Sequence, residues 1–374
     1  MPVITPFKLE RYFALYEFKA RYLLSASDCE SLTMSELLAK ADEDSRERWS
    51  ALSLGYTESL GLPALREEIA RLYQNVPAGQ ILTLTPEEGI FIAMQTLLKP
   101  GDHVICLFPG YQSLYEIARS LGCEVTPWAL NCTDTAWQLD FQALEAAVRP
   151  NTRLLVVNFP HNPTGFLPSH AEQQRIVDFA RAHHLVLFSD EMYRLLEYDP
   201  AKRLPPASDL YEQAISLSGL SKSFALPGLR AGWLATQDEH LFHEWMLYKD
   251  YTTICSSAPS EILALMALRA RDKIIRRNLD IITANLAVTN QFFAEFENLL
   301  DWLPPLAGSI AFPRLKTGQP VDDFCEDVLR QKDVMIVPGS LFDFPGNHFR
   351  LGLGRKNFPQ AMGLLGEYLN QSHC

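Results

Sequence analysis

Short apolar stretches alternate with amphipathic segments between residues 85 and 236. Most of the apolar stretches are rich in valine, leucine and isoleucine, as is typical of strands that are buried on both faces. They cover residues 103–108, 154–159, 185–190, 214–219 and 231–236. The segments 113–122 and 169–184 between them carry apolar side chains at helical spacing. This alternation predicts an α/β domain with a mainly parallel sheet.

The pattern changes in the last third of the chain. Residues 259–300 predict a long helical region that bridges two domains. After Pro304 and Pro305, short strand-like stretches surround one helical segment and predict a smaller α+β unit. We expect the N-terminal residues to pack with this unit. The expected division is therefore a large domain over 46–270 and a small domain made of 1–45 and 271–374.

Composition and charge narrow the class of function. Of the 374 residues, 47% are apolar and 21% are charged, as in a globular protein with a substantial core. The net charge of −12 comes without a long run of either sign, which argues against nucleic acid or an anionic membrane as a partner. The apolar stretches are too short to cross a bilayer, and the N-terminus lacks a secretory apolar region. We therefore expect a cytoplasmic protein that acts on small molecules.

The cysteine and histidine pattern does not predict a metal site. Seven cysteines are scattered and never form a Cys-x-x-Cys pair, so neither a disulfide framework nor a zinc site is expected. His183 and His184 are adjacent near a predicted helix end and face opposite ways. No other ligand lies at a suitable spacing.

Unusual residues follow four of the predicted strands. They are Pro109-Gly110-Tyr111, Asn158–Gly165 (NFPHNPTG), Asp190–Tyr193 (DEMY) and Lys222. In open parallel sheets, ligands bind beyond the carboxyl ends of the strands. Asp190 ends a buried strand, where an isolated carboxylate is costly and requires a cationic partner. The sequence therefore predicts one crevice that holds these groups.

The ordered set of motifs resembles the pyridoxal-phosphate (PLP) enzymes of the aspartate-aminotransferase superfamily, the fold type I group. The motifs are Asn162–Gly165 (NPTG), Ser189–Tyr193 (SDEMY), Ser221-Lys222 with Arg230 following, and Arg350 in FRLGLG. Three further stretches, SDCESL near residue 27, VVNFPHNPTG and GSIAFPRL, are similar to the subgroup around capreomycidine synthase. The resemblance covers nearly the whole chain and implies a large PLP-binding α/β domain with a smaller α+β domain.

The resemblance assigns the chemistry to Lys222 and Asp190. Lys222 forms the Schiff base with the cofactor and carries the proton between substrate Cα and cofactor, and burial is expected to lower its pKa. Asp190 keeps the pyridine nitrogen of the cofactor protonated, so that the ring draws electrons from Cα. The alternatives are a solvated loop lysine and an aspartate that caps the following helix.

Other cofactor contacts follow from the same resemblance. Asn162 and Tyr193 hydrogen-bond the phenolic oxygen of the cofactor, and Tyr111 stacks on its ring. Arg350 binds the substrate carboxylate with two hydrogen bonds, and Asn162 also lies on the substrate side. Taken alone, NPTG is a good turn sequence, Tyr111 fits a core position, and Arg350 fits an exposed edge strand.

The phosphate-binding corner departs from the family pattern. Relatives have a Gly-Ala or Ser-Gly type pair here, whereas this chain has Thr85-Pro86-Glu87-Glu88. Thr85 as N-cap, Pro86 at the first helical position and Glu88 in a capping box still predict a helix start. The backbone N–H groups of Glu87 and Glu88 are then expected to face the phosphate, with both side chains pointing away. Ser221 and Arg230 match their family positions, whereas Gly219 replaces a serine found in many relatives.

Tyr56 predicts a homodimer. It lies in YTESLGLPALR, which resembles a family segment whose tyrosine reaches the cofactor phosphate of the neighbouring subunit. The leucines of this segment also fit the start of an ordinary amphipathic helix.

The sequence thus predicts a PLP-dependent aminotransferase that exchanges an amino group between an amino acid and a 2-oxo acid. The alternatives are a PLP-dependent lyase or cyclase, which needs the same groups, and a PLP-type fold kept as a binding module. Residues 251–261 contain no arginine where dicarboxylate-specific relatives have one. We therefore expect neutral or basic amino donors in preference to aspartate.

Overall fold

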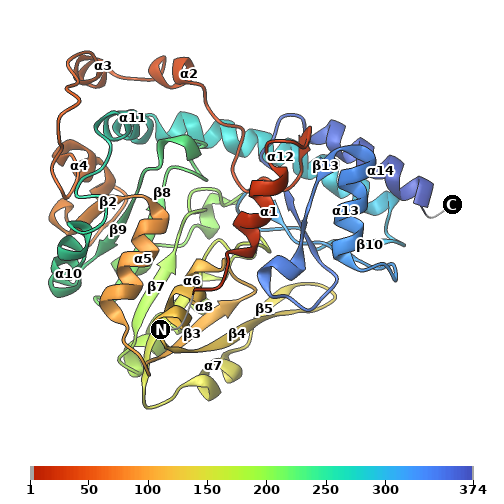
Figure 1. Cartoon of the computed structure of the whole chain (residues 1–374), viewed down its shortest axis with the longest axis horizontal. Coiled ribbons are helices and arrows are strands. Elements are labelled where there is room, and N and C mark those ends of the chain that lie inside the picture. Colours follow the sequence, from red (N-terminus) through yellow and green to blue (C-terminus); the bar gives the residue numbers. More distant parts are fainter. Residues whose placement is uncertain (1–3, 373–374) are drawn as a thin grey trace.

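An eight-stranded sheet forms the centre of the computed structural model, which describes residues 4–372 (Figure 1). Residues 1–3, which the sequence assigns to the small domain, and Cys374, one of the seven cysteines, lie outside the described residues. From edge to edge the strands are β2 (Ile81–Leu84), β9 (Gly232–Thr236), β8 (Ala214–Gly219), β7 (Val186–Asp190), β6 (Thr152–Asn158), β3 (His103–Phe108), β4 (Glu124–Cys132) and β5 (Trp137–Leu139).

The sheet is mixed but mostly parallel, which confirms the predicted fold class. Strands β8, β7, β6, β3 and β4 run parallel to their neighbours in that order, whereas β2 and β9 at one edge and β5 at the other pair antiparallel. Side chains of β3 alternate between two cores: Val104 and Cys106 face one, Ile105 and Leu107 the other. The hydrophobic pattern did not predict β2, β4 or β5, and β4 is largely solvent-facing and contains a proline.

Helices cover both faces of this sheet. On one face, α5 (Pro86–Leu97), α6 (Ser113–Ser120) and α10 (Glu239–Lys249) contribute to one core cluster. On the other face, α7 (Phe141–Ala147), α8 (His170–Ala182) and α9 (Ala207–Leu210) contribute to a second. Thr85 and Glu88 form the predicted capping box at the start of α5, with Pro86 as its first residue.

Smaller sheets and three helices make up the second part of the molecule. The helices are α12 (Arg271–Glu295), α13 (Val321–Lys332) and α14 (Phe358–Ser372). The strands are β11 (Ile310–Ala311) with β15 (Phe349–Gly352) and β14 (Val337–Pro338), β10 (Leu300–Asp301) with β12 (Arg314–Leu315), and β1 (Tyr22–Leu23) with β13 (Val334–Met335). The predicted strands and helix of this unit are present, and α14 is an addition to them.

The helical region expected over 259–300 consists of two helices. Helix α11 (Ala258–Arg269) is followed by Ala270, whose backbone dihedral angles are not helical. Helix α12 begins at the next residue. Residues 261–268 of α11 are buried without a break, whereas α12 is amphipathic and packs against α14. The break at Ala270 separates α11, which packs with the helices of the large sheet, from α12, which packs against α14.

The N-terminal segment contacts both parts of the molecule. Helix α1 (Lys8–Tyr16) lies between them in Figure 1, and β1 pairs with β13. Helices α2 (Met34–Leu38) and α3 (Glu43–Ser50) instead pack against α11. They lie near α4 (Pro63–Ala70), which contacts strand β2 of the large sheet. None of the helices within residues 4–372 is both long enough and apolar enough to cross a membrane.

Candidate active site

Strand order brings the predicted site residues to one edge of the sheet. Asn158 at the end of β6 pairs with Asp190 at the end of β7, and Asp190 pairs with Leu217 of β8. Tyr111 follows β3 and Lys222 follows β8, the strands that flank β6 and β7 in the sheet. The four strand ends therefore lie at one edge of the sheet, the edge at which the sequence predicts a crevice.

A tightly bonded loop positions Lys222. Its backbone carbonyl accepts a hydrogen bond from Ala225 N at 3.2 Å, and its Nζ donates to Ser27 Oγ at 2.8 Å. Ser223 Oγ donates to the carbonyls of Met192 and Arg194, which joins this loop to the segment after β7. Ala225 has φ of 56°, a left-handed conformation that costs a residue with a side chain on the order of 1 kcal/mol or more. The ammonium group is thus directed into the crevice from a constrained loop.

Asp190 is a buried carboxylate at the end of β7, with 6% of its surface exposed. Its Oδ1 accepts a hydrogen bond from Met192 N at 3.1 Å. Burial raises the pKa of Asp190 to about 6, while this hydrogen bond and the charge of Lys222 oppose the increase. A turn and not a helix directly follows Asp190, so its carboxylate does not cap a helix. A cation facing its carboxyl would lower this pKa and stabilise the ionised form.

Arg350 and Asn162 connect the second part of the molecule to the crevice. Arg350 Nη1 donates to Asn162 Oδ1 at 3.2 Å, and its Nη2 donates to Ser25 O at 2.9 Å. Only 1% of Arg350 is exposed, although it carries a full charge, and its Nε has no hydrogen-bond partner among the described residues. The Oη of Tyr193, which is 3% exposed, likewise has none among residues 4–372. A buried polar group without a partner is costly, and a ligand bound beside Arg350 and Tyr193 could supply the missing hydrogen bonds.

Tyr111 is covered by helix α1. Its Oη donates to Glu10 Oε1 at 3.0 Å, and the ring of Phe7 lies with its centroid 4.9 Å from that of Tyr111. Burial, together with Glu87 and Glu10, raises the pKa of Tyr111, so the phenol remains protonated. Phe13, on the same helix, lies 5.8 Å from the guanidinium of Arg350. Helix α1 therefore closes one side of the crevice.

The corner expected to hold the phosphate is narrowed by Pro86. A Cβ at Gly219 would lie 3.0 Å from Pro86 Cγ, and one at Gly232 would lie 2.7 Å from the same atom. The proline ring thus occupies the space in which a side chain at position 219 would lie.

The two glutamates of this corner point in different directions. Glu88 accepts hydrogen bonds from Thr252 Oγ1 at 2.5 Å and Thr253 Oγ1 at 2.7 Å, so its side chain faces the segment after α10. Glu87 does not turn away. It lines a small cavity of about 180 Å³ with Phe7 and Ser113, and burial raises its pKa to about 7.

Two predicted cofactor residues do not enter the crevice of their own chain. Tyr56 is 91% exposed on the loop before α4. Arg230 is exposed, has φ of 51°, and donates from Nη1 to Pro227 O at 3.0 Å. Ser221 is half-buried beside Lys222. Within one chain, the phosphate corner is therefore open on the side of Arg230.

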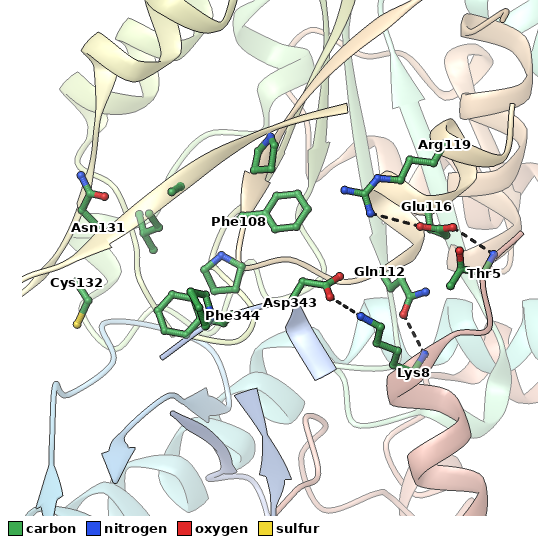
Figure 2. Close-up of a pocket in the computed structure, with 15 residues that line it drawn as sticks. Thr5, Lys8, Phe108, Gln112, Glu116, Arg119, Asn131, Cys132, Asp343 and Phe344 are labelled. Carbon is green, nitrogen blue, oxygen red and sulfur yellow. Dashed lines mark hydrogen bonds and ion pairs between the residues drawn. The ribbon is translucent and has the colours of Figure 1, made fainter. Parts of the chain in front are cut away.

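A second, larger cavity lies between the edge of the large sheet and the second part of the molecule. It has a volume of about 720 Å³ (Figure 2). Thr5 N donates to Glu116 Oε1 at 3.2 Å, Lys8 N donates to Gln112 Oε1 at 2.9 Å, and Lys8 Nζ pairs with Asp343. These charged and amide groups are thus already paired, and they hold the start of α1 against both parts.

Sequence reasoning missed the contribution of α1 and of the segment after β1. Phe7, Glu10, Phe13 and Glu17 are spaced three or four residues apart, which places them on one helical face. This spacing is visible in the sequence and indicates a helix with one face directed at the site. Ser25 and Ser27, which bond Arg350 and Lys222, offered none, because their positions depend on the pairing of β1 with β13.

The arrangement defines an enzyme of the PLP-dependent fold type I class. A lysine, a buried carboxylate in need of a cation, an unpartnered tyrosine hydroxyl and an unpartnered arginine nitrogen meet at the carboxyl edge of a parallel sheet. These groups fit PLP and an amino acid carboxylate. The family profile "Aminotransferase class I and II" matches residues 23–357. The chain belongs to this family.

Curated relatives agree with this assignment. The chain is 30% identical to capreomycidine synthase of Streptomyces vinaceus over 365 residues, which cover 96% of this chain and 91% of the relative. It is 29% identical to aromatic-amino-acid aminotransferase 2 of Thermococcus litoralis, covering 79% of this chain and 78% of the relative.

Solved structures share the fold over its whole length. A PLP-dependent aminotransferase from Streptococcus suis superposes with a TM-score of 0.92 at 30% identity, covering 98% of each chain. The PLP-dependent cyclase OrfR superposes with a TM-score of 0.90 at 27% identity, again covering 98% of each chain.

Proposed function

We propose that this enzyme transfers the amino group of an amino acid to a 2-oxo acid, with PLP bound covalently to Lys222. The observation that carries the proposal is the convergence of Lys222, Asp190, Tyr193 and Arg350 on one crevice, two of them with unpartnered polar atoms. Bound PLP supplies an electron-withdrawing ring that weakens the Cα–H bond of the substrate.

Each residue then has a role that its own contacts support. Arg350, held by Asn162 and Ser25, binds the substrate carboxylate and orients the Cα–H bond. Lys222 Nζ accepts the proton from Cα and returns it on the product side. Asp190 carries the negative charge that faces the pyridine nitrogen, and Tyr193 and Asn162 donate hydrogen bonds on the phenolic side.

A lyase or cyclase is the second candidate. The match to capreomycidine synthase covers 96% of this chain, whereas that to the aromatic aminotransferase covers 79%. Proton removal from Cα by Lys222 also begins eliminations and replacements, so the same residues serve both reactions. A non-catalytic binding module would need neither the buried carboxylate of Asp190 nor a loop that holds Lys222 near it.

The substrate side chain is proposed to be neutral or basic. Residues 251–261 contain no arginine. Helix α1 instead brings Glu10 to Tyr111, and burial, Asp28 and Glu10 raise the pKa of Glu17 against the opposing charges of Arg355 and Lys222. A second carboxylate on the substrate would be repelled here.

We further propose a cytoplasmic homodimer. Tyr56 is 91% exposed on a surface loop, which supports a contact of this side chain with a neighbouring chain. The described cysteines are all free thiols, which suits a reducing compartment.

Borohydride reduction of the PLP-loaded protein tests the central assignment. We expect mass spectrometry to find the pyridoxyl group on Lys222 alone, and Lys222→Ala to lose turnover by several powers of ten while it keeps its fold. Lys202 and Lys249, the lysines before and after Lys222 in the sequence, are internal controls and should carry no pyridoxyl group in the same spectra. Modification of another lysine, with Lys222 unmodified, would overturn the assignment.

A further inference from the structure

A third cavity lies between helix α12 and the segment that follows the active-site strand β7. It has a volume of about 430 Å³, within the usual range of sites for small molecules. One wall is α12, in the second part of the molecule, and the other is the segment 195–203 of the large sheet. The lining of this arginine cavity combines three arginines, two aspartates and three apolar side chains: Arg203, Arg271, Arg276, Asp272, Asp280, Leu195, Ile275 and Leu279.

Two of the arginines have donors available for a ligand. Arg271 makes only long contacts with carboxylates, 3.8 Å from Nη1 to Glu68 Oε1 and 3.7 Å from Nε to Asp272 Oδ1. Its Nη1 is buried without a hydrogen-bond partner among the described residues. Arg276 is exposed on the same helix and forms no ion pair within residues 4–372. Because guanidinium groups form short, charge-assisted hydrogen bonds with carboxylates, these two arginines can hold one carboxylate.

The charge balance of the cavity favours a ligand with a single negative charge. Arg203 is neutralised by the buried Glu197, with 2.8 Å between Nε and Oε2. The side chain of Asp272 is 97% exposed, so solvent screens its charge. The two available arginines therefore outweigh the remaining aspartate, and one carboxylate on the ligand balances them.

The apolar part of the lining fits a short aliphatic chain. Ile275 and Leu279 are four residues apart on α12 and so lie on one face of the helix. Leu195 lines the cavity from the other wall. Its φ of 81° is a left-handed conformation that is costly for leucine, as is often found at functional sites.

Both walls of the cavity are hydrogen-bonded to the loop of Lys222. Ser223, the next residue, donates from Oγ to the carbonyl of Arg194 at 2.6 Å, directly before Leu195. Asn278 of α12 donates from Nδ2 to the carbonyl of Ser223 at 2.9 Å. A ligand that holds the two walls together therefore also restrains the residue beside Lys222.

We propose that the arginine cavity binds a small aliphatic monocarboxylate and that its occupation restrains the loop of Lys222. An aliphatic acid would then regulate the enzyme from outside the crevice. Neither binding nor the restraint of the loop requires PLP or a substrate, so both are tested independently of the proposed function.

Calorimetric titration of the purified protein with isocaproate, at constant ionic strength, tests the binding step. Isocaproamide, which has the same chain without the charge, is the matched probe and should bind about tenfold more weakly or not at all. Arg276→Gln should raise Kd for isocaproate about tenfold, because one charged donor is lost. Lys273→Gln removes an exposed charge from the same helix outside the cavity and should leave Kd unchanged. Equal binding by the wild type and Arg276→Gln would overturn the site and place the carboxylate elsewhere, as at Arg350.

Amide hydrogen exchange tests the restraint of the loop. Saturating isocaproate should slow exchange in residues 219–226 of the wild-type protein, and the same concentration should slow it much less in Arg276→Gln. Thermal unfolding of both variants is the control for their fold. Unchanged exchange in these residues of the wild-type protein, despite bound isocaproate, would overturn the coupling to Lys222.

Discussion

At the scale of single residues, Asp190 is the group whose chemistry the structure defines most sharply. Burial without a full cationic partner raises its pKa to about 6. A protonated pyridine nitrogen in the crevice would lower that pKa again, and the charged pair would in turn keep the ring protonated. Its backbone contact with Met192 requires only an oxygen acceptor, so charge and structure can be separated by one substitution.

Asp190→Asn should therefore retain its fold and still bind PLP. The amide oxygen can accept the hydrogen bond from Met192, but the negative charge at the pyridine nitrogen is lost. We expect proton removal from Cα to slow by on the order of a thousandfold, which corresponds to roughly 4 kcal/mol. Solvent deuterium exchange at Cα measures this step, and thermal unfolding is the control. Normal exchange with lowered stability would show that Asp190 has a structural role only.

At the scale of elements, the start of α5 is packed against two strand ends. Pro86 lies against Gly219 at the end of β8 and Gly232 at the start of β9, where these strands pair. The proline thus fixes the approach of the helix to the sheet. The side chains of Glu87 and Glu88 diverge from this fixed point, one toward α1 and one toward the segment after α10.

Gly219→Ser should destabilise the protein by about 1–3 kcal/mol, because the new Cβ meets Pro86 Cγ at 3.0 Å and Ala231 O at 3.1 Å. The cost should fall when Pro86→Ala is combined with it, since one of the two contacts is then relieved. Urea unfolding of the two single variants and the double variant measures this coupling. Costs that simply add would show that Pro86 and Gly219 are independent.

At the scale of the whole molecule, the crevice is assembled from segments that are distant in sequence. The N-terminal segment bonds Arg350 through Ser25 and Lys222 through Ser27, and α1 covers Tyr111. The side of the phosphate corner near Arg230 is left open by the chain itself, with Tyr56 exposed elsewhere. We therefore expect two chains to complete each other's sites.

Mixing two inactive variants tests this sharing. Lys222→Ala and Tyr56→Phe chains that exchange subunits should form some dimers with one native site, so part of the activity should return. Mixing Lys222→Ala with Asp190→Asn, which alter the same site of one chain, is the matched control and should restore little. Absence of recovery despite demonstrated exchange would exclude a site shared through Tyr56.

Local patterns in the sequence determined the alternating architecture, the parallel strands that carry the site, the capping box at Thr85 and the set of groups at the strand ends. These features depend on near neighbours: side-chain periodicity, helix caps and the family's ordered motifs. The break between α11 and α12 was not visible, because Ala270 has no intrinsic tendency to end a helix and packing decides its conformation. Tertiary structure also decided that Glu87 faces inward, that α1 covers Tyr111, and that Ser25 and Ser27 reach Arg350 and Lys222. Each of these contacts joins segments far apart in the chain, whose approach depends on the packing of the whole molecule.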